Sequence, residues 1–155
     1  MNTTDNWMVH DHRKYETALR EVELAAGAGQ WEEAERLLRE FVDDFKLHMR
    51  IEDEVLYPMF RESVAESGED IDSLVEDHDD IARLLHDLAY VLKQHEYDHF
   101  EDSLGLLYQM MLDHDAYEEE VFSRFGDQSL LARRDEAMAR LNRMRQSGNR
   151  REWSF

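Results

Sequence analysis

The stretch HMRIEDEVLYP, residues 48–58, places a histidine four positions before a glutamate, and the stretch DHDAYEEEVF, residues 113–122, repeats that spacing. A further histidine stands 36 residues before each pair. Three positions therefore recur in the same order 66 residues later, as His12, His48 and Glu52 and then as His78, His114 and Glu118. One pair is weak evidence in a glutamate-rich chain, but three matched positions indicate an internal repeat. The long period predicts a duplicated helical hairpin.

The chemistry of the six repeated residues suits a pair of transition-metal ions. Residues four apart on a helix lie on one face, so each pair can direct a nitrogen and a carboxylate to one point. A carboxylate can bridge two ions, and imidazole and carboxylate suit iron and manganese, and also zinc. The chain has no cysteine, which excludes thiolate ligands. The sequence thus predicts two iron ions, with manganese or zinc as alternatives, and coordination positions left for an oxo or hydroxo bridge, water or a small ligand.

The residues around this pattern predict an all-α domain. Four long amphipathic segments cover about residues 5–26, 31 to 62–66, 71–95 and 100–125. Short connections make consecutive helices antiparallel, so we expect an up-down-up-down four-helix bundle over residues 1–128. Pro58 is expected to kink or close the second helix, and Gly126 to stop the fourth. An additional C-terminal helix, about 129–145, then begins the Arg-rich segment 129–155.

Charge excludes several classes of partner. The net charge of −19 argues against nucleic acid and against anionic membranes, which attract basic surfaces. No stretch has the roughly 18–20 apolar residues of a membrane span, and no secretory signal is visible, so we expect a cytoplasmic protein. Residues 129–155 carry +4 and residues 1–128 therefore −23. The basic C-terminal helix either docks on the acidic bundle or binds a protein partner.

Two other groups of residues are expected to lie outside the ligand set. Three aspartates immediately precede proposed ligands and are expected to be solvated, with tuning of their neighbours as the alternative: Asp11, Asp77 and Asp113. Four tyrosines are expected to pack in the core: Tyr15, Tyr57, Tyr108 and Tyr117. A tyrosine near iron could instead donate a hydrogen bond or occupy a vacant position.

Four segments in combination resemble the motifs of the hemerythrin-like HHE cation-binding domain, over about residues 8–126. They are DHRKYETAL (11–19), HMRIEDEVLYP (48–58), EDHDDIARLL (76–85) and DHDAYEEEVF (113–122). The resemblance implies a four-helix bundle with a non-haem di-iron centre. It also implies that the six repeated residues are the ligands and that Glu52 and Glu118 bridge the two ions.

The chain departs from the oxygen-carrying hemerythrins at two positions. Those proteins have His-x3-His on the third helix, where this chain has Ala82, and His-x4-Asp on the fourth, where it has Glu119. The ligand set is more similar to bacterial domains linked to nitric-oxide stress and iron-centre repair, which typically also carry a cysteine-containing segment. We expect the position left by Ala82 to be vacant, water-filled, or occupied by a donor such as Tyr15 or Glu16.

These observations leave three functional hypotheses. The first is a bacterial di-iron protein that binds or senses O2, NO or peroxide. The second is an enzyme that handles iron or detoxifies peroxide or NO in oxidative or nitrosative stress. The third is a metal-free interaction module that uses the Arg-rich C-terminal helix.

Overall fold

A computed structural model describes residues 3–132, 139–140 and 143. Its side chains are described from residue 12 to residue 124, apart from Ser63 and Ala65, and again at 139, 140 and 143. The described part of the chain is all-helical, as predicted, and contains no strand. None of its helices combines the length and the apolar character that crossing a membrane requires. Most of the predicted C-terminal helix lies outside the described residues.

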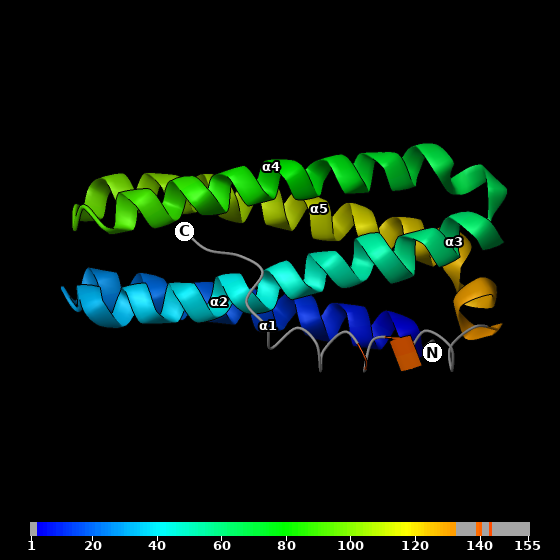
Figure 1. Ribbon diagram of the computed structural model, residues 1–155, viewed down its shortest axis with the longest axis horizontal. Helices are drawn as coiled ribbons and strands as arrows, with labels where there is room; N and C mark the ends of the chain where they lie inside the picture. The colour runs from blue at the N-terminus through cyan, green and yellow to red at the C-terminus, as the bar shows by residue number, and fades with distance from the viewer. Residues whose placement is uncertain (1–2, 133–138, 141–142, 144–155) are drawn as a thin grey trace.

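Four long helices form the fold, and shorter pieces extend the second of them. In chain order the elements are α1 (Thr3–Gly27), α2 (Trp31–Ile51), η1 (Glu52–Leu56), α3 (Tyr57–Ser63), η2 (Ala65–Ser67), α4 (Gly68–Leu92) and α5 (Tyr97–Ala132). The long helices lie side by side along the long axis of the molecule (Figure 1). Helix α1 packs against α2 and α5, and α4 packs against α5 and α2. This arrangement brings the two halves of the sequence repeat face to face.

The first connection is as tight as the sequence predicts. Helix α1 ends at Gly27, and Gly29 has a φ of 75°, a conformation that glycine adopts without strain. The N–H of Gly29 donates to the carbonyl of Ala26 (3.0 Å), and that of Gln30 to the carbonyl of Ala25 (2.9 Å). These bonds satisfy carbonyls that the end of a helix leaves without partners.

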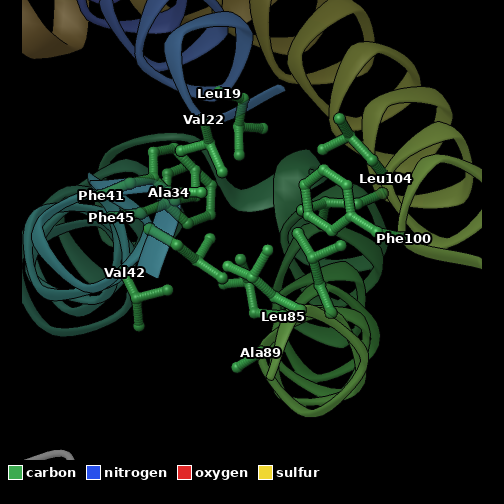
Figure 2. Close-up of a cluster of buried hydrophobic side chains, with 14 of the residues drawn as sticks. Leu19, Val22, Ala34, Phe41, Val42, Phe45, Leu85, Ala89, Phe100 and Leu104 are labelled. Carbon is green, nitrogen blue, oxygen red and sulfur yellow. The ribbon is translucent and has the colours of Figure 1, made fainter. Parts of the chain in front are cut away.

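Two large apolar clusters fill most of the interior of the described part, and Val55 and Met59 form a third, small one. The main apolar cluster joins side chains of all four long helices, among them Leu19, Phe45, Leu85 and Leu104 (Figure 2). The minor apolar cluster consists of Ile51, Leu56, Tyr57, Phe60, Ile71, Leu74, Val121 and Phe122. Burying one such side chain completely contributes about 1.5–3 kcal/mol. The repeated histidines and glutamates lie between the clusters, since on α5 the main cluster ends at Met111 and the minor one begins at Val121.

The second helix continues through Pro58 rather than ending there. Residues 52–56 form a π turn, η1, in which the N–H of Tyr57 donates to the carbonyl of Glu52. Five residues of a regular α-helix would leave these two side chains about 140° apart. In a π turn residues five apart lie about one turn apart. Tyr57 therefore comes close to the face that carries Glu52, and α3 then ends at Ser63, within the range predicted for this helix.

The predicted stop at Gly126 is wrong. Helix α5 passes through Gly126 and continues to Ala132. A glycine inside a helix costs about 1 kcal/mol relative to alanine, which weakens the helix without ending it. The start expected for the C-terminal helix, near residue 129, thus lies within α5.

Candidate metal centre

The six residues that the repeat singles out meet in the interior of the bundle. Each is buried, with at most 6% of its surface exposed. They come from four different helices and from the π turn: His12 from α1, His48 from α2, Glu52 from η1, His78 from α4, and His114 and Glu118 from α5. A cluster of this size assembled from residues up to 106 positions apart follows from the packing of the two hairpins on each other.

The cluster divides into two overlapping groups among the described side chains. In each group one nitrogen or carboxylate oxygen per residue lies within 4.8 Å of the others. One group is His12, His48, Glu52 and Glu118, and the other is Glu52, His78, His114 and Glu118. Both glutamates belong to both groups. The arrangement supplies two sets of metal donors that share both glutamates, each with two histidines of its own.

Every histidine of the cluster turns the same ring nitrogen toward the glutamates. Nε2 of His12 lies 2.9 Å from Glu118, and Nε2 of His114 lies 3.7 Å from it. Nε2 of His48 and of His78 lie 3.2 and 3.1 Å from Oε1 of Glu52. The four Nε2 atoms are therefore the donors available to a metal.

Carboxylates outside the cluster hold the opposite nitrogen of three histidines. Nδ1 of His12 lies 2.9 Å from Glu119, Nδ1 of His78 lies 2.8 Å from Asp53, and Nδ1 of His114 lies 3.0 Å from Asp77. A carboxylate that accepts the Nδ1 proton fixes the tautomer whose Nε2 lone pair faces the metal. Asp77 therefore orients a histidine of the cluster, but this histidine is His114 on α5 and not its sequence neighbour His78.

The outer carboxylates also follow the repeat, which the sequence analysis missed. Asp53 and Glu119 each come directly after a glutamate of the cluster and are 66 residues apart. Each bonds the isolated histidine of the opposite half. Asp113 is exposed and accepts a hydrogen bond from Gln109 (2.9 Å), in agreement with a solvated residue. The side chain of Asp11 lies outside the described ones.

Two buried atoms of the cluster have no hydrogen-bond partner among the described residues. They are Oε1 of Glu52 and Nε2 of His114. The neighbouring Nε2 atoms approach Glu52 closely but not in hydrogen-bonding geometry. A buried polar atom without a partner is costly, and a buried carboxylate more so. A cation bound between the two groups would satisfy both atoms, so the residues fit the metal site that their chemistry predicts.

In the metal-free protein, bound protons compensate part of the negative charge of the buried carboxylates. Burial acts to lower the pKa of His12, but its hydrogen bond to Glu118 and the surrounding carboxylates outweigh burial and raise the pKa to about 10. For His78 burial is likewise outweighed, by Asp53 and Glu52, and the pKa rises to about 10. Burial raises the pKa of Glu118, and the charge of Glu52 adds to the effect. Metal binding must displace these protons.

Tyr57 is a polar neighbour of the cluster and follows the alternative expected for the tyrosines, a hydrogen bond near the centre, rather than packing alone. Its hydroxyl donates to Oε2 of Glu118 and lies 3.5 Å from Nε2 of His78. Burial and the charges of Glu118 and Glu52 raise its pKa well above 10, so the hydroxyl stays protonated and can donate this hydrogen bond. The spacing of a regular α-helix did not place Tyr57 beside the cluster, because Tyr57 reaches the cluster only through the π turn. Tyr15, by contrast, donates to the carbonyl of Asp44 (3.4 Å) and packs its ring against His48.

Asp115 is a further neighbour of the cluster, and the sequence analysis did not single it out. It is buried, with one oxygen 3.5 Å from Nε2 of His12, and burial raises its pKa to about 7. The residue 66 positions earlier is Met49, so the repeat gave no signal for it. The two groups consequently differ, with a carboxylate beside His12 and a phenol beside His78.

The outer carboxylate Glu119 offers a test of this geometry. We expect Glu119→Ala to weaken metal binding about 10- to 100-fold, the usual effect of removing a partner that orients a histidine ligand. Glu120→Ala is the matched control, since Glu120 is exposed and only approaches Arg124 (3.9 Å). Competition with a chromophoric chelator measures the affinities. Equal affinities of the two variants would show that Glu119 does not position His12.

The sequence profile of the hemerythrin HHE cation-binding domain matches residues 3–125. This span contains all six residues of the cluster, together with Tyr57, Asp115 and the outer carboxylates. No curated protein and no solved structure matches the chain.

Proposed function

We propose that this chain, which belongs to the hemerythrin HHE cation-binding domain family, is a non-haem di-iron protein that binds or senses a small ligand such as O2, NO or peroxide. The observation that carries the proposal is the pair of buried groups that share Glu52 and Glu118. Four imidazoles and two carboxylates are donors that suit iron. The proposal includes the up-down-up-down order of the helices, which the short connections after α1 and α4 support.

Iron bound here would supply redox electrons and coordination positions for a small ligand. The chain itself provides the setting. The four Nε2 atoms and the two glutamates would hold the ions. Glu119, Asp53 and Asp77 bond the Nδ1 atoms of three imidazoles and favour the tautomer that this requires. Tyr57 donates a hydrogen bond to Glu118 and stays protonated. The two apolar clusters exclude bulk water from both ends of the site.

The surroundings of His78 favour ready binding of a small ligand rather than its long-term retention. Ala82 lies one helical turn after His78 and supplies no donor where oxygen carriers have a histidine. Besides Oε1 of Glu52 (3.1 Å), the hydroxyl of Tyr57 lies near Nε2 of His78 (3.5 Å). A site with one protein ligand fewer binds small molecules readily but protects reduced iron less well.

Metal analysis tests the proposal most directly. Protein purified without chelator should contain about two iron ions per chain, as expected for di-iron bundles. Less than about one metal ion per chain would refute the di-iron assignment and favour a metal-free module. Exposure of the reduced protein to NO or peroxide then separates two roles. A stoichiometric spectral change supports a binding protein, whereas continued consumption supports the alternative, a detoxifying enzyme.

Ala82→His should prolong the oxygen-bound state. When the reduced wild-type protein is mixed with oxygen, we expect a visible absorption band that decays rapidly. An imidazole at position 82 should slow the decay about tenfold, which corresponds to roughly 1.4 kcal/mol on the barrier. Stopped-flow spectroscopy measures the decay, and Ala116→His, at an exposed position of α5, is the control. A wild-type band that persists for hours would show that the Ala82 position does not limit stability.

A further inference from the structure

An open cavity of about 280 Å³ lies beside the metal centre, between the η1–α3 segment and the first turns of α4. It is lined by Asp53, Tyr57, Pro58, Arg61, Glu62, Ile71 and Val75. Pockets for drug-sized ligands usually measure about 300–1,000 Å³. The volume therefore suits a small molecule.

Two wall residues of the cavity also contact the cluster. The side chain of Tyr57 lines the cavity, and its hydroxyl donates to Glu118 and lies 3.5 Å from Nε2 of His78. Asp53 lines the same cavity and bonds Nδ1 of His78 (2.8 Å). The inner end of the cavity is thus one side chain away from the group formed by Glu52, His78, His114 and Glu118.

The chemistry of the walls favours a neutral, apolar occupant. Pro58, Ile71 and Val75 provide an apolar surface, and Ile71 belongs to the minor apolar cluster. Of the charged wall residues, Arg61 already donates to Asp72 (2.5 Å) and Asp53 already bonds His78 (2.8 Å). The carboxylates of Asp53 and Glu62 repel anions. The net charge of −19 repels anions such as nitrite or superoxide. Neither the walls nor the electric field recruits an anion to this side of the molecule.

We propose that this cavity is the access site for a small neutral gas molecule, O2 or NO, on its way to the metal centre, and that Tyr57 forms its inner end. The assignment of the metal rests on the proposed function, whereas the cavity and its preference for an apolar occupant do not. The gas reaches the His78 side of the centre, where the chain provides no histidine at position 82, and not the His12 side, where Asp115 stands.

Xenon tests the cavity without any metal. Apolar cavities bind xenon, which is neutral and of suitable size. Crystals of the purified protein under xenon pressure should show an atom between Tyr57 and Val75. Val75→Phe fills the cavity and should abolish that density. Val64→Phe adds the same volume against the same apolar cluster but not at the cavity wall, and should retain it. No xenon in the wild-type cavity, or equal occupancy in both variants, would overturn the proposal.

The rate of NO binding tests the route. In iron-loaded, reduced protein we expect Val75→Phe to slow the association of NO about tenfold, roughly 1.4 kcal/mol on the barrier, and Val64→Phe to leave it unchanged. Circular dichroism checks that each variant folds, and Val75→Leu replaces Val75→Phe if the latter does not. Normal iron content with equal rates in both variants overturns the access route. Failure to load iron in the wild type overturns the proposed function instead, and the xenon result still decides on the cavity.

Discussion

Glu118→Gln leaves the protein folded but removes at least half of its bound metal, to about one ion per chain or fewer. Glu118 belongs to both groups of the cluster, so in the proposed di-iron centre its loss would take a ligand from each ion. Glutamine has nearly the same size, and Glu118 is fully buried, so the substitution leaves no void. It also removes a charge that burial and Glu52 already disfavour in the metal-free protein, as the raised pKa of Glu118 shows. We therefore expect Glu118→Gln to preserve the fold but to lower the metal content.

Matched variants separate this effect from a general one. Glu52→Gln should resemble Glu118→Gln, because Glu52 also belongs to both groups. Glu120→Gln and His99→Ala change exposed residues of α5 and should keep the wild-type metal content. Elemental analysis after desalting measures the content, and circular dichroism confirms helicity. If Glu118→Gln and Glu120→Gln retain the same amount of metal, Glu118 does not bridge two ions as proposed.

Removal of the metal should lower the melting temperature by about 8–16 °C. Only the folded chain gathers the six ligands, so binding energy becomes folding energy. At a free metal concentration about a thousandfold above Kd, the added stability is about 4 kcal/mol. For a protein of this size each kcal/mol corresponds to about 2–4 °C. Thermal unfolding of chelator-treated and reloaded protein measures the difference, and equal melting temperatures would contradict a buried site.

The difference between the two forms should widen as pH rises. In the metal-free protein the pKa values of His12 and His78 are raised from 6.5 to about 10, so the stability that they contribute is complete below pH 6.5 and is lost as pH rises through 10. Burial raises the pKa of Asp115 from 3.8 to about 7, so the stability that this residue contributes is likewise lost as pH rises through 7. Metal binding has the opposite dependence, since ligands must be deprotonated. Melting curves at pH 6 and pH 9 should therefore show the smaller metal effect at pH 6.

The sequence predicted the cluster because helical periodicity and the repeat together determine which faces meet. His48 and Glu52 share a face by their spacing alone, and the offset of 66 pairs them with His114 and Glu118. Tyr57 could not be predicted in the same way, because the π turn that moves it exists only in the folded helix. Asp115 has no counterpart in the other half. The error at Gly126 has a different origin, since glycine permits a helix end but does not require one.

The position of the metal centre between the two apolar clusters has a consequence for the cooperativity of unfolding. Along α4 and α5 the main cluster and the minor cluster are separated by the layer that contains His78, His114 and Glu118. Without metal this layer couples the two clusters through buried polar groups, and two of their atoms have no hydrogen-bond partner among the described residues. With metal the same layer joins all four helices. The metal centre therefore connects two parts of the bundle that can unfold separately. We expect the metal-free protein to unfold in separate steps, with the minor cluster first, and the metal-loaded protein to unfold as one unit.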